Sequence, residues 1–359
     1  MDKDIITSKV ICGMQQMGIG VENVQESWKW YKDHFGYDTK IFGDEGVAEK
    51  MLPYTGGKPQ KRYAILVYNL RGGAGFEVWE PRGRELNHIP FEARFGDTGI
   101  FACKLKSRDV KAFYQELRAK NVIPCTEPSA NPAGKLHFFV KDPWGNLFDI
   151  EEDDYTFINE NKNIGGGNGA ILGVTDMDKS IKFYGSIIDY DHVDYDVTDT
   201  FSDFKGVPGG EFKLRRVMLS RSKPIEGPLC EVMGTSHIEL VMRVPDFDVP
   251  APKKIYEGRL WGDPGFIHLC FDIRNMEEVR KASEAMGHKF VCDGGRNFKM
   301  GEANGHFTYI EDPDGTLIEF VETFKVPILK KLGIYLHLEN RDDKKPLPRV
   351  ITKALRFLK

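Results

Sequence analysis

The sequence predicts an α+β fold in which four βαβββ modules stand in tandem, paired into two curved mixed β-sheets flanked by helices. A strand–helix–strand pattern recurs four times along the 359 residues. Two of the copies end on an Asp-Pro-x-Gly turn between strands, at residues 142–145 and 312–315. A single module would leave one sheet face and two edges bare, so the modules must combine in pairs.

The first module begins with an apolar, strand-like run at residues 16–21. Residues 24–35 then place apolar side chains on one helical face, and Gly36 ends this predicted helix. The three strands that follow are expected at residues 39–43, 62–70 and 75–81.

The other modules repeat this order with a strand, a helix and further strands. The second is expected at residues 99–105, 108–122 and 136–152. The third is expected at residues 169–190, 212–221 and 236–242. The fourth is expected at residues 267–273, 276–287 and 306–320.

A polar, glycine-rich segment separates the second and third modules and predicts a linker at residues 158–168. It divides the chain into one domain of two modules at 10–157 and another at 169–324. The basic tail at 325–359 fits no fifth module. Residues 348–358 predict a short amphipathic helix in it, which we expect to serve as a packing arm or a dimer contact.

Composition describes an ordinary globular protein, with 41% hydrophobic and 29% charged residues. A net charge of -4 gives no field that would attract nucleic acid or an anionic membrane. Six cysteines without a CxxC pair fit a reducing cytoplasm, and the N-terminal residues do not resemble an export signal. We therefore expect a small-molecule partner, no nucleic acid and no membrane; a homodimer is compatible with the sequence.

Two helix starts carry a resemblance to a known family. The patterns V-x-x-S-x-x-W-Y at residues 24–31 and DMDKSIKFY at 176–184, with the endings DPWGNLFDI at 142–150 and DPDGTLIEF at 312–320, resemble the vicinal oxygen chelate superfamily. This superfamily includes glyoxalase I, extradiol dioxygenases and bleomycin-binding proteins. The resemblance spans about residues 10–325 and implies the fold above. It implies the activity less closely, because this fold hosts lyases, isomerases, oxygenases and pure binders.

The resemblance also implies where metal ligands would stand, at the first strand and the last strand of each module. The first-strand positions fall, in module order, at Gln16, near Ile100, at Gly169 and at His268. The last-strand positions fall, in the same order, at Glu77, Asp149, Glu239 and Glu319.

Module pairing decides which of these residues meet. If neighbouring modules pair, the first pair has no imidazole and neither pair holds a complete ligand set. If module one pairs with module four, the middle modules keep only Asp149 and Glu239 as remnants. The two ends of the chain would then build one site, with the combination that glyoxalase I uses: Gln16, Glu77, His268 and Glu319.

Two carboxylates, one imidazole and one amide oxygen can neutralise a divalent ion and leave two octahedral positions for a chelating substrate. The expected cofactor is one divalent metal ion, with Zn, Ni, Co, Mn and Fe as candidates. Such an ion stabilises an enediolate, and an adjacent carboxylate can move the proton. We expect Glu319 to act as this base, with Glu77 as the other catalytic candidate.

Several residues compete for these roles. Glu80 competes with Glu77, since strand alternation lets only one of them face inward. His237 shares a strand face with Glu239, so these two residues are the candidates for an alternative metal site. His306 is a candidate acid beside the metal ligands. Each of these residues, taken alone, is more often an ordinary surface or core position.

Three functions remain open. The sequence favours a metal-dependent lyase or isomerase resembling glyoxalase I that acts on a small oxygenated substrate. A glutathione conjugate is not expected, since the family's glutathione-contacting residues fall at Gly20, Pro81 and Pro264. The first alternative is a non-haem Fe(II) extradiol-type dioxygenase, whose first histidine position is held here by Gly169. The second is a non-catalytic binder of the bleomycin-resistance type.

Overall fold

The computed structural model describes residues 8–296, 298–300, 303–329 and 334–358. The first module holds β1 (Val10–Gly20), α1 (Val24–Phe35), β2 (Thr39–Ala48), β3 (Gln60–Tyr68) and β4 (Gly75–Arg82). The second holds β5 (Gly99–Ser107), α2 (Val110–Ala119), β6 (Ser129–Ala130), β7 (Leu136–Lys141) and β8 (Leu147–Glu152).

The third module adds a short helix before its last strand. It holds β9 (Ile164–Gly173), α3 (Met177–Ile188), β10 (His192–Asp199), β11 (Leu214–Ser220), α4 (Cys230–Met233) and β12 (His237–Arg243). The fourth holds β13 (Gly265–Arg274), α5 (Met276–Ala285), β14 (Cys292–Asp293), β15 (Phe298–Met300), β16 (Ala303–Glu311) and β17 (Leu317–Leu329). The tail adds β18 (Ile334–His337) and α6 (Arg349–Thr352).

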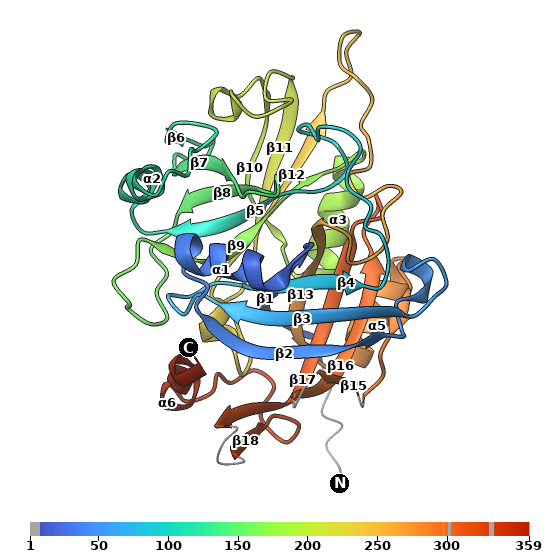
Figure 1. Ribbon diagram of the computed structural model, residues 1–359. Helices are drawn as coiled ribbons and strands as arrows, with labels where there is room; N and C mark the ends of the chain where they lie inside the picture. The colour runs from blue at the N-terminus through green and yellow to red at the C-terminus, as the bar shows by residue number, and fades with distance from the viewer. Residues whose placement is uncertain (1–7, 297, 301–302, 330–333, 359) are drawn as a thin grey trace.

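The strands form two curved mixed sheets, so the predicted fold class is confirmed (Figure 1). Sheet A has the order β14-β16-β17-β13-β1-β4-β3-β2, and sheet B has the order β10-β11-β12-β9-β5-β8-β7-β6. Module one therefore pairs with module four, and module two pairs with module three. In Figure 1 the blue strands β1 to β4 and the orange strands β16 and β17 lie in one sheet.

Modules one and two lie in different sheets, as do modules three and four, and each of these pairs is joined through a helix. The hydroxyl of Tyr31 on α1 donates to Asp142 in the second module's turn, at 2.7 Å. The hydroxyl of Tyr184 on α3 makes the same contact with Asp312 in the fourth module's turn, at 2.8 Å. Both carboxylates are buried, and burial raises the pKa of Asp312 to about 6. Each predicted Asp-Pro-x-Gly turn is thus an anchor for the helix of the preceding module.

The ends of helix α1 follow from its local sequence. The side chain of Asn23 accepts hydrogen bonds from the amides of Gln25 and Glu26 and caps the first turn. Gly36 ends the helix in the left-handed conformation, as predicted. Tyr31 and Phe35 are buried on the face that packs into the core.

The predicted linker at 158–168 is wrong for residues 164–168, which belong to the buried strand β9. The glycines there are needed because two sheets approach closely. The amide of Gly166 donates to the carbonyl of Gly72 at 2.8 Å, and a Cβ on Gly166 would lie 2.8 Å from the backbone of Gly73. The same composition that indicates a flexible linker also permits close backbone packing.

The C-terminal tail packs on its own chain. Residues 349–358 are helical, near the predicted segment, and Leu347 and Leu355 are buried. Strand β18 pairs with the end of β17. None of the helices in the described ranges is both long and apolar enough to cross a membrane.

The cross-paired sheets predict that the two halves of the chain depend on each other. Fragments 1–160 and 161–359 should copurify when they are co-expressed with an affinity tag on one fragment. Either fragment alone should aggregate, because β1, β5, β9 and β13 would each lose a strand partner. Size-exclusion chromatography provides the measurement. Two separately folded, monomeric halves would contradict the pairing.

Candidate metal centre

Four adjacent strands of sheet A carry the predicted ligands. Glu319 lies on β17, His268 on β13, Gln16 on β1 and Glu77 on β4. Gly18 on β1 stands opposite both His268 and Glu77 in the strand register. The pairing of the two chain ends therefore brings these side chains together.

The ligand-type atoms converge in the interior of the sheet. Nε2 of His268 lies 3.1 Å from Oε2 of Glu319 and 3.5 Å from Oε2 of Glu77. The side-chain amide of Gln16 donates to Oε2 of Glu319 at 3.4 Å. All four residues are buried. In the described part of the chain, one group of three or more His, Cys, Asp or Glu residues has ligand atoms that all lie within 4.8 Å of one another. This group is Glu77, His268 and Glu319.

Gly18 makes room for the imidazole. A Cβ at this position would overlap the ring of His268. The ring of Trp261 lies nearly parallel to that of His268, with ring centroids 6.4 Å apart and an interplanar angle of 10°. The ring of His268 is therefore held in one orientation by its neighbours.

The cluster is electrostatically incomplete. Burial raises the pKa of Glu77 to about 7, and repulsion from Glu319 adds to the shift. Burial acts to lower the pKa of His268, but the two carboxylates outweigh it and the pKa is raised. Nε2 of His268 has no aligned hydrogen-bond partner among the described residues, although Glu319 is close. A buried imidazole nitrogen without a partner, aimed at two carboxylates, fits a divalent cation.

Tyr309 is a member of the site that the sequence interpretation missed. Its hydroxyl lies 3.5 Å from Nδ1 of His268, on the side opposite the free Nε2. When Nδ1–H donates to the hydroxyl oxygen of Tyr309, the lone pair of Nε2 is free to bind a metal. Tyr309 stands opposite Glu319 across the β16–β17 hairpin. Counting back from the Asp-Pro-Asp-Gly turn could have found it.

Glu80, the competitor of Glu77, lies outside the cluster. Its carboxylate accepts a 3.0 Å hydrogen bond from the backbone amide of Val24 and so caps the start of α1. It also pairs with Arg82 at 2.9 Å. The structure thus gives Glu80 a role at a helix end.

The structure does not bring the alternative pair, His237 and Glu239, into a common metal group. Nδ1 of His237 lies 3.6 Å from Asp194 near the surface. Glu239 is fully buried and is bound by Arg216 and by the hydroxyl of Tyr195, each at 2.8 Å. Its carboxylate is therefore already neutralised by a protein cation.

Sheet B contains a lysine where sheet A could hold an ion. Nζ of Lys104 lies 2.5 Å from Asp149, 3.0 Å from Glu151 and 3.1 Å from Glu239. Asp149 and Glu239 are the last-strand counterparts of the ligands in sheet A. Burial acts to raise the pKa of Glu239, but the charges of Arg216 and Lys104 outweigh it and lower the pKa to about 2. Sequence interpretation missed this role, because Lys104 looks like any charged residue in a strand.

His306 lies on β16 and lines the same cavity as Gln16 and Glu319. Its Nε2 is 2.6 Å from Oδ1 of Asp293, and Asp293 also binds Arg280 at 2.7 Å. A role for His306 as an acid beside the ligands stays a prediction.

Comparisons with known proteins agree with this architecture. The family model of the Glyoxalase/Bleomycin resistance protein/Dioxygenase superfamily matches residues 13–150 and 168–320. Glyoxalase I from Zea mays is similar in structure, with a TM-score of 0.52 and 16% sequence identity over 88% of this chain and 92% of that chain. A putative dioxygenase from Bacillus subtilis gives a TM-score of 0.53 and 16% identity over 88% of this chain and 86% of that chain. At this identity the likeness concerns the fold. No curated protein sequence matches the chain.

Replacing the central cation of sheet B should destabilise the protein strongly. We expect Lys104→Met to lower the free energy of unfolding by about 3–5 kcal/mol, because it leaves buried carboxylates without this partner. Lys111→Met, at an exposed position on α2, is the control and should change stability by less than about 0.5 kcal/mol. Urea unfolding measures both. Equal stability of the two variants would contradict a structural role for Lys104.

Proposed function

Because the chain belongs to the Glyoxalase/Bleomycin resistance protein/Dioxygenase superfamily, we propose that it is a metal-dependent lyase or isomerase. One divalent ion would be held by the amide oxygen of Gln16, the carboxylates of Glu77 and Glu319, and Nε2 of His268. The substrate would be a small molecule with vicinal oxygens, and the reaction a proton transfer through an enediolate.

One observation carries this proposal. Two carboxylates and an imidazole are buried together, and neither carboxylate forms an ion pair with Lys or Arg within the described ranges. Burying such charges without a cation is costly, whereas a divalent ion would offset both carboxylates and bond the free Nε2. When bound, the ion would supply Lewis acidity that eases removal of a proton next to a substrate carbonyl.

The protein's own groups would move that proton. Both carboxylates line the cavity, and the side chain of Glu319 is 8% exposed whereas that of Glu77 is 3% exposed. Glu319 is thus the more accessible base, and Glu77 remains the other candidate. Gln16, whose amide contacts Glu319 at 3.4 Å, would hold that carboxylate in place during the transfer.

A glutathione conjugate fits poorly as the substrate. The family's arginine position on the first strand is Gly20 here, and a Cβ at Gly20 would overlap the carbonyl of Asp263. No larger side chain can stand at this position without a shift of the backbone. The substrate should therefore be recognised by contacts other than arginine–carboxylate pairs.

The dioxygenase alternative would need a different set of metal ligands. Non-haem Fe(II) oxygenases use two histidines and one carboxylate, whereas this cluster contains one histidine and two carboxylates. A non-catalytic binder would need neither metal nor base.

A cytoplasmic location fits six free cysteines, five of which are buried. A homodimer remains a prediction.

Metal content tests the proposed centre. After dialysis of the purified protein, elemental analysis should find about one divalent ion per chain. His268→Ala should lose it, because the variant removes the one imidazole ligand. His237→Ala is the matched control and should retain the ion. A metal-free wild type, or loss of the ion from His237→Ala alone, would overturn the assignment.

Activity separates the candidate reactions. We expect turnover of hemithioacetals formed from an α-oxoaldehyde and a small uncharged thiol, loss of turnover after treatment with EDTA, and recovery when a divalent ion is returned. Catechol cleavage, followed by oxygen consumption, should be absent. Oxygen-dependent ring cleavage would favour the dioxygenase, and ligand binding without any turnover would favour the binder.

A further inference from the structure

An apolar cavity of about 140 Å³ opens onto the metal centre. The strands β2 and β3 of sheet A contribute Phe42 and Leu66 to it, and the segment around α4 contributes Leu229 and Met233. Strands β15 to β17 of the fourth module contribute Phe298, Phe307 and Val326. A further part of the wall comes from the C-terminal tail that follows these strands and lies outside the four modules. The side chains that the tail contributes are Leu336, Leu347, Ile351, Thr352 and Leu355.

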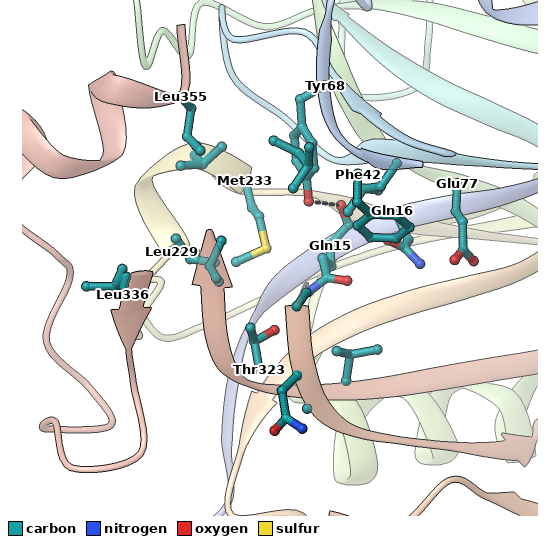
Figure 2. A pocket seen from close by; sticks show the side chains of 18 of the residues that line it. Gln15, Gln16, Phe42, Tyr68, Glu77, Leu229, Met233, Thr323, Leu336 and Leu355 are labelled. Carbon is teal, nitrogen blue, oxygen red and sulfur yellow. Dashed lines mark hydrogen bonds between the residues drawn. The ribbon is translucent and has the colours of Figure 1, made fainter. Parts of the chain in front are cut away.

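The ligand-type residues and the leucines of the tail lie at opposite ends of this cavity. Figure 2 shows Gln16 and Glu77 at one end and Leu336 and Leu355 at the other. Tyr68, Gln15 and Thr323 lie between them, and the hydroxyl of Tyr68 donates a 2.8 Å hydrogen bond to the carbonyl of Gln15. A ligand whose head reaches Glu77 would therefore extend its body between aliphatic side chains.

The tail wall is tied to the rest of the fold by specific contacts. The amide of Leu347 donates to the carbonyl of Pro228 at 2.9 Å, and the amide of Gly227 donates to the carbonyl of Lys344 at 2.9 Å. Arg349 pairs with Glu231 on the outer side, at 3.1 Å. These bonds place the tail against α4, so its leucines form a built part of the cavity.

The charge of the lining restricts what can bind. Among the described residues that line the cavity there is no lysine or arginine, and His306 is the one basic side chain. Its Nε2 is already engaged by Asp293 at 2.6 Å. A carboxylate, phosphate or sulfonate on the body of a ligand would lose its water without gaining a cation. An uncharged body would instead gain from burial of its apolar surface.

We propose that the C-terminal tail is a specificity element, and that the substrate has an oxygenated head attached to an uncharged, apolar body about the size of one aromatic ring. A cavity on the order of 150 Å³ lined by aliphatic side chains accepts a ring of this size. This inference rests on the proposed metal centre, which would hold the head. Leu355 packs in one cluster with Phe42, Leu66 and Tyr68 of the cavity wall, so it is the tail residue whose replacement tests this wall.

Three hydroxamates test this inference on the protein loaded with Mn²⁺. All three chelate a divalent ion through two oxygens. Acetohydroxamate carries only a methyl group, benzohydroxamate carries an uncharged ring, and 4-carboxybenzohydroxamate carries the same ring with an anion at its far end. Calorimetric titration gives each dissociation constant. We expect benzohydroxamate to bind at least tenfold more tightly than either of the other two, and a tenfold difference corresponds to about 1.4 kcal/mol.

A pair of substitutions locates the effect in the tail. Leu355 is 7% exposed and Phe357, on the same turn of helix, is 66% exposed. Leu355→Asp should weaken benzohydroxamate at least fivefold and change acetohydroxamate by less than twofold. Phe357→Asp should change neither by more than twofold. The comparison of the three probes on the unaltered protein needs no variant, so a folding defect in Leu355→Asp does not remove the test.

The outcomes separate this inference from the function on which it rests. A protein that takes up no Mn²⁺ and binds no acetohydroxamate overturns the metal centre and the substrate class together. A protein that binds Mn²⁺ and acetohydroxamate, but gains nothing from the ring or tolerates the carboxylate, overturns the apolar substrate alone. An unchanged affinity for benzohydroxamate in a folded Leu355→Asp variant overturns the role of the tail.

Discussion

The antiparallel pairing of β1 with β13 is the contact on which the rest of this structure depends. It joins the first module to the last and makes β17, β13, β1 and β4 neighbours in one sheet. Each of these strands contributes one ligand-type residue. Gln16 and Cys270 pair at this contact although they are about 250 residues apart along the sequence. The site therefore exists only in the complete fold. Modules two and three pair with each other in sheet B.

The two sheets solve the same electrostatic problem in different ways. Both carry buried carboxylates at equivalent last-strand positions, and buried carboxylates need a cation. In sheet B the cation is built in, since Lys104 lies among Asp149, Glu151 and Glu239. In sheet A no lysine or arginine within the described ranges pairs with Glu77 or Glu319, and His268 is the neighbour that they share. The difference explains why we assign a metal to one sheet and scaffold to the other.

The fold could be predicted from the sequence because each module repeats the same elements, and the repeated turns at Asp142 and Asp312 are visible as motifs. The pairing could be inferred because only one arrangement collects His268 with Glu77 and Glu319. Other features depend on contacts that no local pattern encodes. The glycines at 165–167 have the composition of a linker, yet they are buried where two sheets meet. Lys104 and Tyr309 gain their roles from neighbours distant in the chain. The apolar cavity is formed partly by a tail that belongs to no module.

The central claim is that the two ends of the chain build one metal centre and that the middle modules build none. Anomalous X-ray diffraction from crystals grown with Mn²⁺ or Zn²⁺, with data on both sides of the absorption edge, tests this claim most directly. The account predicts one anomalous peak per chain, within bonding distance of Glu77, His268 and Glu319. A peak among the carboxylates around Lys104, or no peak in sheet A, would contradict it.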